Sequence, residues 1–175
     1  MQFAVLGWPA DGPTLDLDWR RFAYAGKFVM SNTGKAVARR DGEVVGAIAF
    51  NADRSDERRA WIRYVTVAKG ARGEGIGTAL TEYTADRLLE RFDVVRAAAN
   101  NPYSFESFVK AGFGFIGETA GDDGLVLERP TDDRADRYTS GMRRFLDRDL
   151  TEDERAFVEA KSERGPPRRE GKGGD

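Results

Sequence analysis

A glycine-rich loop set between a strand and a helix constrains the fold of this chain most. Residues 61–67 are mostly β-branched or aromatic, as strands are, and four glycines follow between positions 70 and 77. Apolar residues at helical spacing then predict a helix over 76–92, and residues 94–99 predict a further strand. The order strand, loop, helix, strand predicts a parallel strand pair with a right-handed crossover.

The segments before the loop predict strands and one helix. Residues 1–8 form a short apolar run that indicates a strand. Residues 35–40 and 44–50 flank Asp41-Gly42, a pair typical of a tight hairpin turn. Apolar residues at steps of three and four predict an amphipathic helix from Leu15 to about Met30.

The segments after the loop predict a short helix, a hairpin and a C-terminal extension. Asn101 followed by Pro102 is typical of a helix start. Residues 113–118 and 125–129 predict two strands joined by a turn. We therefore expect one main domain over 1–129, a helical extension over 130–160 and a disordered tail over 161–175, where Gly, Pro and charge dominate.

The composition excludes several classes of protein. With 175 residues, 40% of them hydrophobic, the chain is long enough for one domain with a core. Neither a signal peptide nor a membrane span of about 20 apolar residues is visible, which favours a cytoplasmic protein with no membrane partner. The net charge of -2 argues against nucleic acid as a partner.

The absence of cysteine and histidine limits the chemistry. Zero Cys and zero His remove disulfides, thiol nucleophiles, the imidazole base and most zinc sites, so we expect no metal. Catalysis has to use carboxylates, hydroxyls, backbone groups or water.

The loop itself suits an anion. Glycines let the backbone approach a ligand closely, and the free N–H groups and dipole at a helix start favour a phosphate. Glycines entering a helix also serve flexibility alone. The Gly-Lys-Ser/Thr of a P-loop is absent, and Thr78 occupies the third small position of a dinucleotide motif counted from Gly73.

Two separated motifs give this chain a family resemblance. Val67 is followed by Arg72, Gly75 and Gly77, spaced Arg-x-x-Gly-x-Gly, and later by Asn101, Lys110, Gly112 and Phe113. With the element order, this resembles the GNAT N-acetyltransferase superfamily over residues 1–129. The resemblance implies an α/β (α+β) fold with a mostly antiparallel central sheet, a splayed parallel strand pair and flanking helices. It also implies direct transfer of an acetyl group from acetyl-coenzyme A to a primary amine of a small molecule, a peptide N-terminus or a lysine.

The resemblance assigns roles to particular residues. The backbone N–H of Val67 is expected to stabilise charge on the thioester carbonyl as an oxyanion donor. Positions that are expected to contact coenzyme A are Val65, Thr66, Val67, Arg72, Gly73, Glu74, Gly75, Ile76, Gly77, Thr78, Asn101, Ser104 and Phe108.

This chain departs from the family pattern at the usual acid and base. Phe108 stands where relatives commonly have a tyrosine that protonates the leaving thiolate, and Trp61-Ile62-Arg63 replaces a strand glutamate that activates the amine. Glu118 is the candidate base, with Glu43, Asp122 and Asp123 as other acids. Water handing the proton to solvent is the alternative.

Two further expectations concern partners. Asp122 and Asp123 form an acidic turn that could draw in a cationic acceptor, although Asp and Gly also favour turns for backbone reasons. The chain is expected to be a monomer or a homodimer. A catalytically weak or inactive acyl-coenzyme A sensor is the alternative function.

Overall fold

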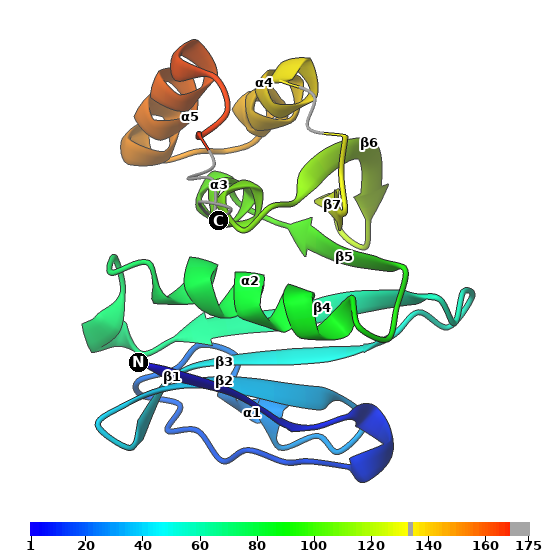
Figure 1. Ribbon diagram of the computed structural model, residues 1–175. Coiled ribbons are helices and arrows are strands. Elements are labelled where there is room, and N and C mark those ends of the chain that lie inside the picture. The colour runs from blue at the N-terminus through cyan, green and yellow to red at the C-terminus, as the bar shows by residue number, and fades with distance from the viewer. Residues whose placement is uncertain (133–134, 169–175) are drawn as a thin grey trace, which may run out of the picture. The chain divides into compact units, whose positions relative to one another are not determined.

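The computed structural model describes residues 1–132 and 135–168 (Figure 1). The chain divides into two compact units, Met1–Ala97 and Ala98–Asp175, and each is described by itself. Within the described residues the strand order is β1-β2-β3-β4-β5-β7-β6, in which β4 and β5 are parallel and the β1–β2, β2–β3, β3–β4 and β6–β7 pairs antiparallel. The expected fold class, a mixed and mostly antiparallel sheet with flanking helices, is confirmed.

The first unit contains the parallel pair and the glycine-rich loop. Its elements are β1 (Gln2–Gly7), η1 (Pro9–Asp11), α1 (Ala25–Phe28), β2 (Gly34–Arg40), β3 (Glu43–Ala52), β4 (Arg59–Val67), η2 (Lys69–Ala71), α2 (Ile76–Leu88) and the start of β5 (Val94–Ala99).

Local sequence signals account for the strand connections. Asp41 and Gly42 both have positive φ, 52° and 80°, so the β2–β3 hairpin closes through the tight turn that this pair predicts. The parallel register of β4 and β5 runs from Arg59↔Val94 to Ile62↔Ala97, and β4 then continues to Val67. The expected parallel strand pair is therefore confirmed.

Helix α2 packs against one face of the first unit's sheet (Figure 1). A Cβ atom at Gly46 of β3 would lie 3.3 Å from Ile76 Cγ2 and 3.4 Å from a methyl group of Leu80. Glycine therefore allows the close approach of α2. Side chains of β3 that alternate with Gly46, such as Ala47 and Ala49, face the other side of the sheet.

The prediction of a helix from Leu15 to Met30 is wrong. Only Ala25–Phe28 is helical, and Trp19, which the periodicity places on the buried stripe, is 73% exposed. Contacts from distant residues hold the segment in a non-helical path: Lys35 Nζ donates to the carbonyl oxygens of Pro13 and Met30, each at 2.8 Å. Lys35 is fully buried, so these tertiary contacts override the local pattern.

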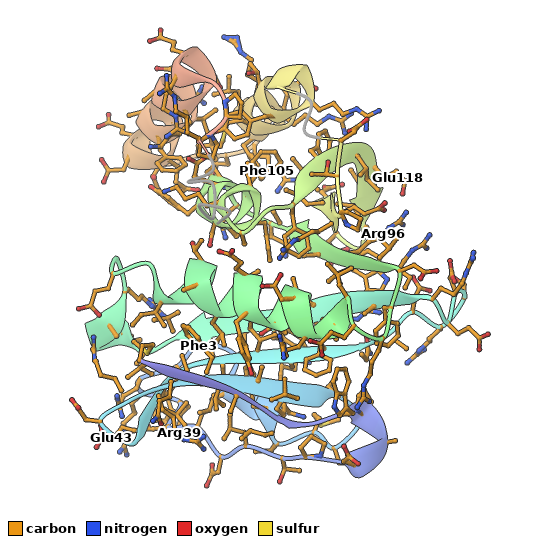
Figure 2. The ribbon with its side chains drawn as sticks, in the orientation of Figure 1. Phe3, Arg39, Glu43, Arg96, Phe105 and Glu118 are labelled. Atoms are coloured by element: carbon orange, nitrogen blue, oxygen red, sulfur yellow. The ribbon has the colours of Figure 1, made fainter. Side chains whose placement is uncertain are left out.

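The second unit has its own apolar core around Phe105. Its elements after β5 are α3 (Pro102–Lys110), β6 (Gly114–Ala120), β7 (Gly124–Arg129), α4 (Ala135–Arg144), η3 (Phe145–Asp147) and α5 (Glu152–Arg164). The ring of Phe105, which is labelled in Figure 2, is central to it. It lies 5.9 Å from the rings of Phe115, Tyr138 and Phe145. The C-terminal extension thus packs on the core that α3 and β6 share.

The C-terminal helices confirm one sequence signal and correct another. Thr151 and Glu154, a Thr-x-x-Glu pattern typical of a helix start, form a capping box at the start of α5. The helix continues to Arg164, four residues into the segment expected to be disordered, and residues 169–175 lie outside the described part. Among the described residues, no helix is long and apolar enough to cross a membrane.

Candidate functional site

The loop between β4 and α2 has backbone conformations that require glycine. Gly73 has φ 83°, and Gly75, the N-cap of α2, has φ 80° and ψ 9°. Both values lie in the left-handed region, which side chains with a Cβ atom disfavour. A Cβ atom at either position would meet nothing within 4 Å, so the space beside the loop is open and the conformation alone explains the glycines.

The start of α2 can hold an anion. The first N–H groups of a helix have no intrahelical acceptor, and Gly75 has no side chain to cap them. The 13 residues of α2 add a dipole whose positive end is at this loop, where Arg72 is exposed. Gly77 brings the helix against β4, since a Cβ atom there would lie 3.3 Å from Val67 Cγ2. Open space, free donors and a guanidinium together fit a pyrophosphate.

Glu74 is the one acidic side chain between Arg72 and Gly77. Its Oε2 atom lies 3.0 Å from Arg40 Nη1 of β2, and the two side chains are 50% and 43% exposed. The ion pair offsets a charge that would otherwise repel a phosphate at the loop. Nothing in the sequence pattern pointed to Arg40.

The last three residues of β4 have distinct surroundings. Val65, Thr66 and Val67 pair with Ile48, Ala47 and Gly46 of β3. The carbonyl oxygen of Val67 accepts a hydrogen bond from Arg72 Nε at 3.3 Å. Thr66 is 3% exposed, and its hydroxyl has no hydrogen-bond partner among the described residues.

Two of the residues expected to contact coenzyme A lie in the first turn of α2. Ile76 is buried and Thr78 is half-buried, so neither side chain is fully open to a ligand.

In the second unit, Asn101 and Ser104 form a local cap at the start of α3. Asn101 Oδ1 accepts from the backbone N–H of Ser104 at 2.9 Å, and the Ser104 hydroxyl donates to the Asn101 carbonyl at 3.0 Å. These bonds give both side chains a structural role in starting the helix.

Phe108 is 7% exposed and packs against Phe113, with ring centroids 5.6 Å apart and planes at 63°. The position of the usual general acid is therefore filled by a core aromatic ring. Position 108 therefore offers no hydroxyl group that could act as a general acid.

The candidate acids of the second unit lie on β6 and its turn. Glu118 is exposed on β6 (Figure 2). It falls within an irregular stretch, because the register passes from Phe115↔Leu127 to Thr119↔Leu125. The regular alternation of side chains is therefore interrupted around Glu118.

Asp122 and Asp123 are exposed in the turn between β6 and β7. Arg148, just after η3, donates to the carbonyl oxygens of Asp123 and Asn100, the latter at 3.1 Å. The extension therefore anchors the backbone of the acidic turn, a contact that the sequence did not predict.

The structure thus groups the sequence-predicted residues into two sets. The residues from Val65 to Thr78 come together in the first unit, whereas those from Asn101 to Asp123 belong to the second. No group of three or more Asp or Glu side chains among the described residues is arranged to hold a metal ion.

Comparisons with known proteins identify the family of this chain. The model of the acetyltransferase (GNAT) family matches residues 4–113, more than half of the chain. The chain belongs to the GNAT acetyltransferase family. A comparison with curated proteins gives no match.

Solved structures of GNAT proteins are similar in fold. GCN5 from Tetrahymena is 20% identical, with 63% of this chain and 78% of that chain covered and a TM-score of 0.50. A ribosomal-protein-alanine N-acetyltransferase from Brucella melitensis is 28% identical, with 55% and 68% covered and a TM-score of 0.48. A Bacillus subtilis acetyltransferase in complex with CoA is 15% identical, with 55% and 75% covered and a TM-score of 0.47.

Proposed function

We propose that this GNAT protein transfers the acetyl group of acetyl-coenzyme A directly to a primary amine of a small molecule, a peptide N-terminus or a lysine. The observation that carries the proposal is the loop from Arg72 to Gly77. Its two glycines with positive φ open the start of α2 to a ligand, and Arg72 adds a positive charge. The pyrophosphate of coenzyme A is the anion that a protein of this family has to bind.

The residues of this chain supply binding and positioning more than proton transfer. The pyrophosphate is held by the loop, and the backbone N–H of Val67 stabilises negative charge on the thioester carbonyl. Phe108 offers no proton to the leaving thiolate, which departs without an acid because its conjugate thiol has a pKa of about 8.5 with cysteine as the guide. The amine loses its proton to Glu118 or to water.

A sensor that binds acyl-coenzyme A without turnover is the second candidate. It is favoured by Phe108, a buried core ring in place of an acid, and by Arg63, a cation on the strand where relatives carry a glutamate. Both functions use the same loop, so they differ only in the transfer step.

Other parts of the proposal concern the setting of the protein. We propose a cytoplasmic monomer or homodimer that works without a metal, a membrane or nucleic acid. Acetyl-coenzyme A and the amine acceptor are its partners.

Two measurements test the function separately. Calorimetry with coenzyme A should show binding at one site per chain. Release of the free thiol from acetyl-coenzyme A, followed with a panel of amines, should show turnover with at least one of them. Binding without turnover on any amine would favour the sensor, and absence of binding would reject both functions.

A further inference from the structure

A β-bulge in β4 changes which side chains share a face of the first unit's sheet. The register with β3 passes from Ala49↔Tyr64 to Phe50↔Ile62, so Arg63 is an extra residue without a partner opposite. Ala49 and Asn51 of β3 point to the same face, and their partners are Tyr64 and Trp61. The bulge therefore places Trp61 and Tyr64 together on one face.

Arg63 lies on that same face. Its Nε donates to Asn51 Oδ1 at 2.7 Å, and its guanidinium lies 5.0 Å from the centre of the Trp61 ring. Gly46 faces α2, and Ala49 and Asn51 lie at odd-numbered steps from it on β3. The face of Trp61, Arg63 and Tyr64 is thus the one that α2 does not cover.

The segment around α1 adds an aromatic ring and a cation to this face. The Tyr24 ring lies 5.5 Å from that of Tyr64, and Lys27 Nζ lies 5.7 Å from the Tyr64 ring centre. Tyr24 is 58% exposed although it has φ 61°, an uncommon value for a tyrosine. We call Tyr24, Lys27, Trp61, Arg63 and Tyr64 the aromatic cationic patch.

The buried ammonium of Lys35 fixes the segment that carries Tyr24 and Lys27. Besides the carbonyls of Pro13 and Met30, Lys35 Nζ donates to the carbonyl and hydroxyl oxygens of Thr33 at 2.8 and 2.7 Å. Lys35 pairs with Ala49, so its side chain lies on the patch side of the sheet. The patch is therefore a held surface rather than a loose loop.

The charge of the patch is positive. Arg63 and Lys27 are exposed, and neither forms an ion pair with a carboxylate in the part of the chain that the structure describes. The nearby carboxylate of Asp53 is already engaged, since it accepts from Trp61 Nε1 at 2.6 Å and lies 3.5 Å from Arg59 Nη1. Two cations thus remain for a ligand.

We infer that this patch binds an anionic group of the amine acceptor. The inference rests on the proposed function and names its substrate class, an amine with a negative charge roughly 10 Å from the reacting nitrogen. Tyr64 lies three residues before Val67, the proposed oxyanion donor, and a strand rises about 3.3 Å per residue. A peptide with an acidic side chain at its third residue has this spacing. The acceptor's anion takes the place opposite Arg63 and Lys27, beside aromatic rings that exclude water.

The phosphates of coenzyme A are the other anions available to the patch. The two sources differ in what a charge reversal does. If the patch serves the acceptor, Arg63→Glu and Lys27→Glu leave coenzyme A binding unchanged and alter the choice of peptide. If it serves coenzyme A, they weaken coenzyme A binding and leave the choice of peptide as it was.

The test uses three peptides whose third residue is negative, neutral or positive. Ala-Gly-Glu-Ala, Ala-Gly-Gln-Ala and Ala-Gly-Arg-Ala, each with an amidated C-terminus, are offered to the full chain as acceptors. Their N-acetylated products are titrated by calorimetry, so that a preference is measured even without turnover. Arg87→Glu on α2, against the opposite face of the sheet, makes the same charge change as a control.

At low salt we expect the glutamate peptide and its product to be favoured by about fivefold over the glutamine peptide and its product, as for exposed charge pairs. The arginine peptide and its product should be the least favoured. Arg63→Glu and Lys27→Glu should reverse this order, and Arg87→Glu should keep it. Equal binding of the three products, or an order that both patch variants leave unchanged, overturns the inference. Loss of coenzyme A binding in the patch variants also overturns it. A wild type that fails to bind coenzyme A but ranks the products as expected contradicts the proposed function and not the patch.

Discussion

Arg72 Nε donates to the carbonyl oxygen of Val67 at 3.3 Å, which ties the glycine-rich loop to the end of β4. One side chain thus links the proposed phosphate site to the residue whose N–H is the proposed oxyanion donor. The hydrogen bond uses only one of five guanidinium N–H groups, and the others remain for a phosphate.

Replacing Arg72 should therefore affect binding and transfer together. Arg72→Lys keeps a charge but loses the planar fork, and we expect coenzyme A affinity to fall about tenfold, with a larger fall for Arg72→Gln. Calorimetry gives the affinity, and the rate at saturating acetyl-coenzyme A reports the transfer step. Equal affinities of wild type and Arg72→Gln would remove Arg72 from the site.

Substitutions at Gly75 separate the effect of an added charge from that of an added side chain. Gly75→Asn and Gly75→Asp add side chains of nearly equal size where a Cβ atom meets nothing within 4 Å, and Asn and Asp tolerate positive φ better than other residues. Only the aspartate places a negative charge at the phosphate position, so its coenzyme A affinity should be at least about tenfold lower than that of the asparagine variant. Gly70→Asp, which also points into open space, is the control for added charge. Similar calorimetric affinities for Gly75→Asn and Gly75→Asp would show that no phosphate lies there.

Phe108→Tyr tests whether the missing acid limits the rate. General acid catalysis contributes about 10²-fold to 10⁴-fold, so a hydroxyl at this position should raise kcat if the thiolate leaves near it. The variant should also acquire a rate decrease at high pH, where tyrosine loses its proton. Phe108→Ala, in contrast, removes a side chain that is 7% exposed and should lower the free energy of unfolding by about 3 kcal/mol. A Phe108→Tyr variant with the kcat and pH profile of the wild type would exclude this position as the place of the leaving group.

The elements predicted well from the sequence are those with a local chemical signal. Asp41-Gly42, Asn101-Pro102 and the pair Thr151 and Glu154 each satisfy backbone groups within a few residues, and the turn and the two helix starts lie where they predict. The glycine-rich loop belongs with them, because positive φ restricts the choice of residue at Gly73 and Gly75.

The features that the sequence did not reveal depend on partners far along the chain. The prediction of a helix over 15–30 was wrong because Lys35 hydrogen-bonds to residues near both ends of this segment. The sequence alone does not show that a lysine in a strand is buried. The bulge at Arg63 is defined by the pairing with β3 and not by the residues of β4. For the same reason the sequence missed that Trp61 and Tyr64 share a face.

A buried polar cluster joins the C-terminal extension to α3. Tyr138 of α4 donates to Glu106, which is 2% exposed, and Arg164 Nη2 of α5 lies 2.6 Å from Glu106 Oε1. Burial first, and then the hydrogen bond to Glu106, raises the pKa of Tyr138 above its ordinary value of 10.0. The cluster therefore prefers the neutral phenol.

This shift makes stability depend on pH in the alkaline range. A folded-state pKa above the unfolded value gives stability that is fully present below about pH 10 and is lost as the pH rises, by about 1.4 kcal/mol per pH unit. Tyr138→Phe should cost about 1 kcal/mol near neutral pH, and the difference from the wild type should shrink above pH 10. Urea unfolding from pH 7 to 11 gives the free energy of unfolding of the wild type and of Tyr138→Phe. A difference between the two that stays constant over this range would contradict the pKa shift.

The acidic turn of Asp122 and Asp123 provides the last test, on the cationic end of the acceptor. The anchor of this turn is a backbone contact, since Arg148 donates to the Asp123 and Asn100 carbonyls and not to a carboxylate. The double variant Asp122→Asn and Asp123→Asn therefore removes two charges and keeps the anchor, which makes it a clean change of charge. If the turn draws in the ammonium group, the KM for the acceptor should rise a few-fold at low salt with kcat little changed, because exposed charges act mainly before the transfer step.

Raising the salt concentration for the wild type should have the same effect on this KM, since exposed charges are screened beyond about 10 Å at 0.1 M. Arg148→Ala separates anchoring from charge: it frees the turn while leaving both carboxylates. An acceptor KM that the double variant leaves unchanged at low salt would make this an ordinary turn, shaped by Gly121 and by the positive φ of Asp123 alone.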